Sequence, residues 1–189
     1  MRLFVALPIS SQLRERLALF LGELRQTDAN PRWARPENLH VTLKFIGPFA
    51  GEQLGEIARA LEKVAPRPPI ALEIRGMGFF PNDRRPAVAW AGIEAPPELA
   101  ALAAQVDEAL APCGIARDKR AFLPHLTLAR LKEPRLSGPL RALAANSQDR
   151  VFGAQIATEF HLMESKTKST GAEYTTLHSF PFEAGGTPR

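Results

Sequence analysis

Apolar and polar positions along the chain alternate between two periods, and their order predicts a repeated arrangement of strands and helices. Residues 2–7 form a short apolar run, and residues 10–26 then carry leucines at helical spacing. Residues 39–47 return to a period of two, residues 51–65 show a second helical pattern, and residues 70–80 read as a third strand. The first part of the chain is therefore predicted to run β-α-β-α-β.

The same order of patterns then recurs, which predicts two related lobes with a groove between them. Proline and glycine interrupt the patterns at the places where the elements should end. The expected elements are a strand at 85–94, a helix at 96–111, a strand at 122–131, a shorter helix at 135–146, strand material over 151–165 and a last strand at 173–182. Residues 27–38 read as a loop. We expect one domain over 1–183, with lobes of approximately 1–80 and 86–182 between which the chain can cross, and a flexible tail at 184–189.

Composition narrows the class of protein. The chain has 189 residues, of which 45% are hydrophobic, enough for a sizeable core. No apolar run reaches the roughly 18–20 residues that span a bilayer, and the N-terminus does not resemble a signal peptide. The single cysteine, Cys113, excludes an internal disulfide and suits a reducing compartment, so a cytoplasmic location is expected. The sequence carries no signal of oligomeric state, and a monomer is the default expectation. The net charge of +4 favours anionic partners such as phosphate or RNA.

One short pattern occurs twice, as "HVTL" at residues 40–43 and "HLTL" at residues 125–128. Both copies fall on the second strand of their half. Alternate side chains of a strand share a face, so His and Thr of each copy should point the same way. Strict alternation also puts Lys44 on the face of His40, and it puts Arg130 on the face opposite His125.

Two such pairs facing one groove supply a defined set of catalytic groups. A neutral histidine accepts a proton from water, and a protonated histidine gives one to a leaving oxygen. The threonine hydroxyls donate hydrogen bonds to anionic oxygens. Cleavage of a phosphodiester without a metal needs these groups. The residues alone leave open which histidine takes which role, and they leave open a binding module that holds RNA or a nucleotide without turnover.

At the level of whole motifs, "RPENLHVTLKFIG" and "FLPHLTLARL" resemble the two signatures of the two-histidine phosphoesterase superfamily. The opening "MRLFVALPIS" and the late "LMESKTKSTGAEYTTLHSFPF" resemble its RNA 2′,3′-cyclic phosphodiesterase branch, also called 2′-5′ RNA ligases or LigT-like proteins. The resemblance implies a bilobal α+β fold from a duplicated β-α-β-α-β unit, with antiparallel sheets or a barrel lining a central groove.

The resemblance also implies an activity and roles for residues. The implied reaction is hydrolysis of RNA ends or nucleotides with a 2′,3′-cyclic phosphate to a 2′-phosphate, with no metal and no cofactor. His40 is the implied proton donor, His125 the implied proton acceptor, and Thr42 and Thr127 the implied phosphate contacts. Arg130 occupies a position that is typically basic in this branch and is a candidate for substrate binding. Reverse reaction to a 2′-5′ linkage would use the same groups and stays open.

Other side chains are weaker candidates. Trp33, Phe122 and Tyr174 are of the type that stacks on a nucleobase, although each is also typical of core packing. His161 and His178 have no companion cysteines or acidic clusters, so no metal site is expected there. No phosphate-binding glycine loop of the ATPase type occurs, which argues against an ATP-driven ligase.

Overall fold

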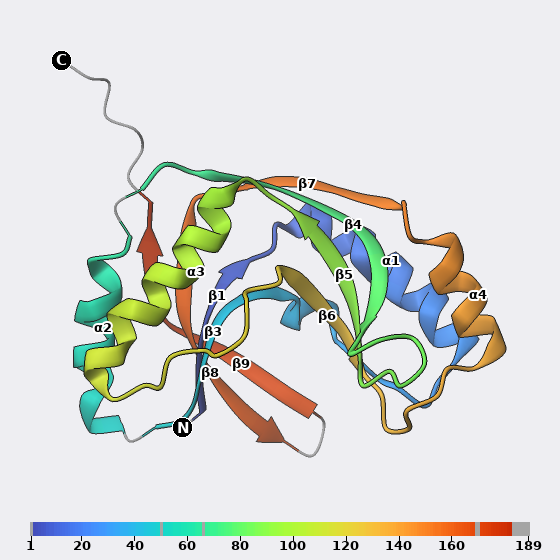
Figure 1. Ribbon diagram of the computed structural model, residues 1–189, viewed down its shortest axis with the longest axis horizontal. Helices are drawn as coiled ribbons and strands as arrows, with labels where there is room; N and C mark the ends of the chain where they lie inside the picture. Colours follow the sequence, from blue (N-terminus) through green and yellow to red (C-terminus); the bar gives the residue numbers. More distant parts are fainter. Residues whose placement is uncertain (1, 50, 66, 169–170, 183–189) are drawn as a thin grey trace.

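Both predicted β-α-β-α-β units are present in the computed structural model, which describes residues 2–49, 51–65, 67–168 and 171–182 (Figure 1). The first unit comprises β1 (Arg2–Pro8), α1 (Ser11–Thr27), β3 (His40–Pro48), α2 (Leu54–Glu62) and β4 (Ile70–Phe80). The second comprises β5 (Val88–Glu94), α3 (Pro97–Leu110), β6 (His125–Arg130), α4 (Gly138–Asn146) and β7 (Val151–Ala157). A final hairpin of β8 (Glu159–Lys168) and β9 (Gly171–Pro181) completes the fold.

At three places the structure contains short elements that the hydrophobic pattern of the sequence did not resolve. The expected strand material over 151–165 is two strands that meet at Thr158. The expected loop at 27–38 contains the two-residue strand β2 (Arg32–Trp33) and a 3₁₀ turn at Pro36–Asn38. Two further 3₁₀ turns, Gly51–Gln53 and Ala111–Cys113, lie next to α2 and α3. The predicted tail, 184–189, lies outside the described residues.

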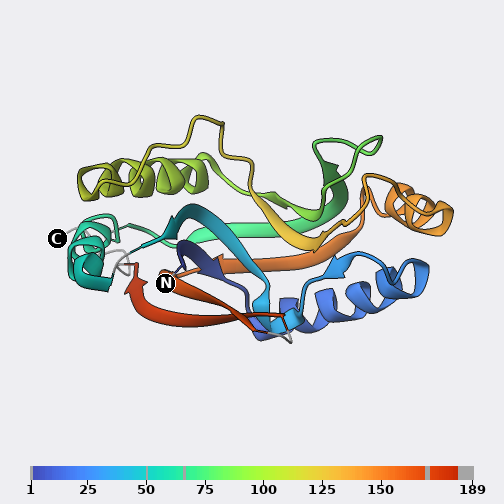
Figure 2. The ribbon, with the colours of Figure 1, turned by 90° about the horizontal axis from the view of Figure 1, so that it is seen from below.

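The strands form one curled, antiparallel sheet in the order β7-β4-β5-β6-β3-β1-β8-β9, and β2 pairs with β6 (Figure 2). The α+β class with a duplicated unit is therefore confirmed. The second strands of the two units, β3 and β6, are neighbours at the centre of the sheet. The two units are interleaved in the sheet, because β4 of the first unit lies between β5 and β7 of the second.

The helices cover the sheet in two pairs. α1 packs against β7 and α4, and α2 packs against α3, which contacts β3 (Figure 1). Serine side chains begin two of the helices, since Ser10 accepts a hydrogen bond from the amide of Leu13 and Ser137 accepts one from Leu140. Apolar side chains of all four helices and of the sheet face beneath them form one continuous core. The other face of the sheet carries no helix and is called the helix-free face below.

No helix among the described residues is both long and apolar enough to cross a bilayer.

Candidate active site

The two repeated stretches lie side by side on β3 and β6. Val41 of β3 pairs with Leu126 of β6 in antiparallel register, and both side chains are fully buried in the core. Because neighbouring residues of a strand point to opposite faces, the His and Thr on either side of each must point to the helix-free face. The side chains that share this face are His40, Thr42, His125 and Thr127.

Antiparallel register also decides which members of the two pairs are opposite each other. One residue on either side of the Val41–Leu126 pair, His40 comes beside Thr127 and Thr42 beside His125. Cross-strand neighbours have Cβ atoms about 4.5–5.5 Å apart. The positive charge of His125 also acts on His40, whose pKa it lowers. The four polar groups thus surround one small region of the sheet, with near two-fold symmetry.

Both histidine rings are held in the same way. Nδ1 of His40 lies 2.7 Å from the carbonyl oxygen of Asn38, and Nδ1 of His125 lies 2.7 Å from that of Leu123. A carbonyl oxygen only accepts hydrogen bonds, so Nδ1 carries the hydrogen in each ring. Nε2 is consequently the atom left for a ligand. It is a base when the ring is neutral and an acid when the ring is charged.

Aromatic side chains surround His40. Its ring centroid is 4.8 Å from that of Phe4 and 5.3 Å from that of Tyr174, which meets it edge to face. Burial by these neighbours lowers the pKa of His40 below its ordinary value, the hydrogen bond with Asn38 raises it, and the charge of His125 lowers it again. The net shift is downward, which favours the neutral ring.

A β-bulge at the same step of each motif changes the faces of the residues that follow. In β3, Thr42 pairs with Ala6 but Lys44 pairs with Val5, so Leu43 is the extra residue. In β6, Thr127 pairs with Trp90 but Ala129 pairs with Ala89, so Leu128 is the extra residue. An extra residue reverses the alternation beyond it. The strict alternation expected from the sequence is therefore wrong after residues 43 and 128.

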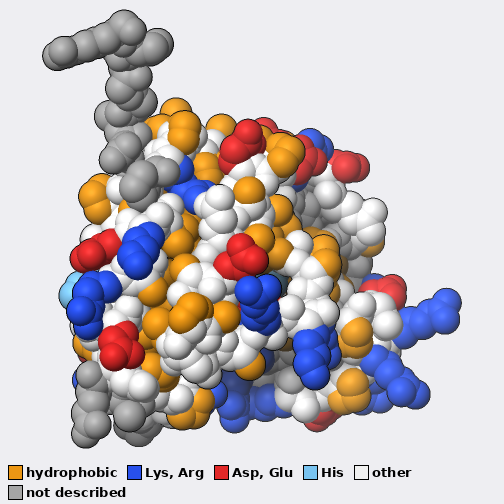
Figure 3. Space-filling model, turned by 60° about the vertical axis from the view of Figure 1, so that its left-hand side comes forward, with side chains coloured by type: hydrophobic (Ala, Val, Ile, Leu, Met, Phe, Trp, Pro, Cys, Tyr) orange, Lys and Arg blue, Asp and Glu red, His pale blue; other side chains and the backbone are white. Residues whose placement is uncertain are grey.

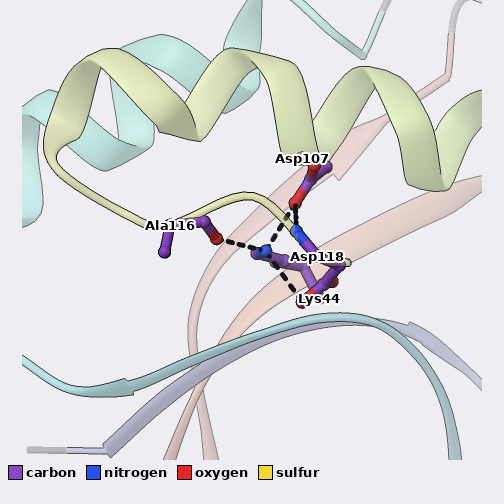
Figure 4. Close-up of polar contacts among 4 residues, drawn as sticks. All are labelled: Lys44, Asp107, Ala116 and Asp118. Atoms are coloured by element: carbon purple, nitrogen blue, oxygen red, sulfur yellow. Dashed lines mark hydrogen bonds and ion pairs between the residues drawn. The ribbon is translucent and has the colours of Figure 1, made fainter. Parts of the chain in front are cut away.

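Lys44 is the first residue that the bulge displaces. It lies on the core side and is only 2% exposed, not on the face of His40. Its Nζ contacts Oδ1 of Asp107 at 2.5 Å, the carbonyl oxygen of Ala116 at 2.7 Å and Oδ1 of Asp118 at 3.1 Å (Figure 4). This cluster joins β3 to α3 and to the segment that leads from α3 toward His125.

The bulge in β6 has the opposite effect on Arg130. The bulge at Leu128 returns it to the face of His125 and Thr127, where strict alternation did not put it. Its charge lowers the pKa of Tyr174, although burial of that hydroxyl outweighs the effect and raises the pKa overall.

The three aromatic candidates differ in where they lie. Tyr174 is beside His40, as described. Trp33 packs against the core, and its Nε1 donates a hydrogen bond to the carbonyl oxygen of Asp28 at 2.8 Å. Phe122 also packs against the core. Two aromatic residues near the site, Phe80 and Trp90, were not singled out from the sequence, because each occurs in a strand of ordinary apolar pattern.

Of the remaining histidines, His161 pairs with Ala6, which pairs with Thr42, so it lies two strands from Thr42 on the same face, whereas His178 lies on β9. Nε2 of His161 is 3.0 Å from Oε1 of Glu159, and the exposed His178 packs on Phe180. Over the described part of the chain, no group of three or more His, Cys, Asp or Glu side chains is placed to hold a metal ion.

Comparison with known proteins identifies the family. The profile of the 2′-5′ RNA ligase superfamily matches residues 13–168. The chain belongs to the 2′-5′ RNA ligase superfamily. An RNA 2′,3′-cyclic phosphodiesterase of Archaeoglobus fulgidus is 35% identical over 182 residues, covering 95% of this chain and 99% of the relative. One of Methanothermobacter thermautotrophicus is 32% identical over 180 residues, covering 95% and 97%.

Solved structures share the fold of this chain. A protein of Thermus thermophilus superposes with a TM-score of 0.83 at 27% identity, covering 98% of this chain and all of that one. Escherichia coli LigT complexed with 3′-AMP superposes with a TM-score of 0.78 at 24% identity, covering 96% and 97%. The second likeness supports the fold alone.

Proposed function

We propose that this chain hydrolyses the 2′,3′-cyclic phosphate at an RNA end to a 2′-phosphate, by acid–base catalysis with His40 and His125 and without a metal. The observation that carries the proposal is the pairing of two His-Thr sets on adjacent strands, each with Nε2 available. The relatives named RNA 2′,3′-cyclic phosphodiesterases support the substrate class.

The proposed reaction follows from an in-line displacement at phosphorus. Nε2 of neutral His125 takes a proton from water, and the water oxygen forms a bond to phosphorus. The bond from phosphorus to the 3′ oxygen breaks, and protonated His40 gives its Nε2 proton to that oxygen. The products are a 2′-phosphate and a 3′ hydroxyl, with one water consumed. Proton exchange with solvent then restores both rings. The donor and acceptor labels follow the family motifs.

Thr42 and Thr127 are proposed to donate hydrogen bonds to the non-bridging phosphate oxygens. Each hydrogen bond to a charged group contributes roughly 1.5–3 kcal/mol. Arg130, returned to this face by its bulge, adds a fixed positive charge beside the phosphate. The anion should also raise the pKa of His40, which burial lowers. Substrate binding would then charge the ring that has to donate.

The charge of the molecule is consistent with an RNA partner. On the face in Figure 3, Lys and Arg side chains gather toward the lower right of the molecule. The net charge is +4. We propose that the protein acts on RNA as a monomer in the cytoplasm, where its single Cys113 would stay reduced.

The test is hydrolysis of an RNA with a 2′,3′-cyclic end in excess chelator, with products resolved by mass. We expect full activity with chelator, and a fall of about 10²–10⁴-fold in kcat for His40→Ala and for His125→Ala. His178→Ala is the matched control, because His178 is exposed and lies outside the site. Undiminished activity in the double His40→Ala/His125→Ala variant would refute the proposal.

The two roles are separated by a substrate with sulfur in place of the 3′ oxygen. A thiolate leaves without protonation, so this substrate should recover most of the activity of His40→Ala but little of that of His125→Ala. Recovery in His125→Ala instead would reverse the assignment and leave the reaction class intact.

A further inference from the structure

A cavity of about 500 Å³ is lined in part by His125, and residues of β4 and β5, on the side of β6 opposite β3, also line it. It lies between β4, β5 and the segment that precedes β6. Its walls include Phe80, Trp90, Leu123, Pro124 and His125, and the polar residues that line it include Arg75, Glu94, Gln148 and Asp149. Ligand cavities of about 300–1,000 Å³ with apolar walls and a few polar groups are typical of small-molecule sites.

The indole of Trp90 lines this cavity. Trp90 pairs with Gly78 of β4 on one side and with Thr127 of β6 on the other. A Cβ at residue 78 would lie only 2.3 Å from the ring, so the indole lies over Gly78 and needs a glycine there. The aromatic surface therefore begins one strand away from the phosphate-binding hydroxyl proposed for Thr127.

Nothing in the described part of the protein holds this indole by hydrogen bonding. Its buried Nε1 has no partner among the described residues, whereas Nε1 of Trp33 donates to a carbonyl oxygen. Nε1 of Trp90 is closed to solvent, so a ligand in the cavity can contact Trp90 only through its ring.

Phe80 makes the aromatic surface continuous with the histidine. Its ring centroid is 5.2 Å from that of Trp90 and 5.0 Å from that of His125, which it meets edge to face. His40 has its own aromatic neighbours, Phe4 and Tyr174, on the other side of the pair. Two separate aromatic surfaces thus flank the point where the phosphate is proposed to bind.

We propose that the Trp90–Phe80 cavity binds a second nucleoside, other than the one that carries the reacting phosphate. The inference rests on the function proposed above and adds the size of the substrate. One nucleoside has one base and cannot occupy both aromatic surfaces, and the cavity has room for a second. Stacking on Trp90 is sequence-tolerant, because every base has a π face.

Two sources can supply such a nucleoside: the preceding nucleotide of the same strand, or the end of a second strand. The first source makes a dinucleotide with a cyclic end a better substrate than a cyclic mononucleotide. If the second source is correct, an added oligonucleotide with a free 5′ hydroxyl occupies the cavity as a competitor or an acceptor. In that case the dinucleotide and the mononucleotide should have the same kcat/KM.

The kinetic experiment compares kcat/KM for a cyclic-ended dinucleotide with that for the cyclic mononucleotide, with and without an added 5′-hydroxyl oligonucleotide. We expect the dinucleotide to be preferred by about 5- to 100-fold, the range that one aromatic stacking partner provides. The preference should fall toward one in Trp90→Ala and in Gly78→Ala, whose new Cβ displaces the indole. Trp33→Phe, outside the cavity, should keep the preference.

A binding experiment covers the case in which the Trp90 or Gly78 variants do not fold. In Trp33→Phe, Trp90 is the sole tryptophan of the chain. Its fluorescence should be quenched by a dinucleotide 2′-phosphate at concentrations about 5- to 100-fold lower than by the mononucleotide 2′-phosphate. Quenching by the 5′-hydroxyl oligonucleotide alone would support the cavity and assign it to a second strand.

The inference and the function fail in different ways. Equal kcat/KM for the two substrates, together with Trp90 fluorescence that responds to neither dinucleotide nor oligonucleotide, would overturn the second-nucleoside site. Quenching of Trp90 by the dinucleotide in a protein that hydrolyses neither substrate would support the site and contradict the proposed function.

Discussion

At the scale of residues, the two histidines are alike in their hydrogen bonding but differ in their surroundings. Both rings donate from Nδ1 to a carbonyl oxygen two residues earlier. His40 is enclosed by Phe4 and Tyr174, and its pKa is lowered by burial and by the charge of His125. In the free protein this asymmetry favours a neutral His40, which is the reverse of its proposed role as proton donor, so the bound phosphate has to raise the pKa of His40 before that ring can donate.

The lowered pKa of His40 predicts a response to anions. Phosphate bound between the rings favours the charged form, so the pKa of His40 should rise when inorganic phosphate is added. The measurement is an NMR titration of the histidine side chains with and without phosphate, with the exposed His178 as an internal reference. The proposed phosphate position would be contradicted if phosphate binds to the protein but the pKa of His40 is unchanged or falls.

The same shift affects stability in a defined direction. The unfolded chain takes up a proton on His40 near pH 6.5, whereas the folded protein does so only at a lower pH. The free energy of unfolding should therefore decrease as the pH falls below about 6.5, and His40→Asn should remove that part of the decrease.

At the scale of elements, the paired bulges in β3 and β6 decide which side chains reach the site. Each bulge follows the Thr of its motif and reverses the alternation beyond it. Arg130 is thereby turned toward the histidines, and Lys44 is turned into the core. The Lys44 cluster then fixes the segment after α3 that continues to His125 (Figure 4).

Breaking that cluster should cost stability. Lys44→Ala removes the buried cation from Asp107, which is partly exposed and keeps the Asp118 amide, and losing a hydrogen bond to a charged group destabilises by roughly 1.5–3 kcal/mol. Burial raises the pKa of Asp107, but hydrogen bonds from Lys44 and the Asp118 amide outweigh it and lower the pKa overall. The carboxylate therefore stabilises the fold above about pH 3.9, and this contribution is lost as the pH falls through the lowered pKa.

The measurement is denaturant unfolding of Lys44→Ala beside Arg141→Ala, a control in which an exposed arginine pairs at the surface with the exposed Asp83. The control should change the free energy of unfolding by about 1 kcal/mol or less. Equal effects of the two substitutions would show that the buried cluster does not hold the segment after α3.

The sequence predicted the repeated unit and the two His-Thr sets because both are local patterns of spacing. It did not predict the bulges, because whether Leu43 or Leu128 is an extra residue depends on pairing with β1 and β5. The burial of Lys44 likewise depends on Asp107 and Asp118, which are distant along the chain. Trp90 has no local signature either, since its position is decided by Gly78 on the neighbouring strand.

At the scale of the whole molecule, the sheet interleaves the two units. β4 comes from the first unit but pairs with β5 and β7 of the second, and α1 packs against β7. The connection between the units, residues 81–85, is nevertheless exposed. A cut in this loop therefore removes one covalent link and leaves the sheet pairing in place.

Limited trypsin treatment tests this arrangement. Cleavage after Arg84 should give two fragments that elute together in native size-exclusion chromatography and separate only in denaturant. An Arg84→Gln/Arg85→Gln variant should lose that cut and serves as the control. Fragments that part without denaturant would show that the pairing of β4 with β5 and β7 is too weak to join the units.

The interleaved sheet also divides the proposed catalytic residues between the two fragments. The fragment up to Arg84 carries His40 and Thr42, and the fragment from Arg85 carries His125 and Thr127. Neither fragment holds a complete acid–base pair. If the halves are produced separately and fused to two interacting partners, phosphodiesterase turnover becomes a signal of their association. The strand order thus makes this small protein a candidate split enzyme for fragment complementation.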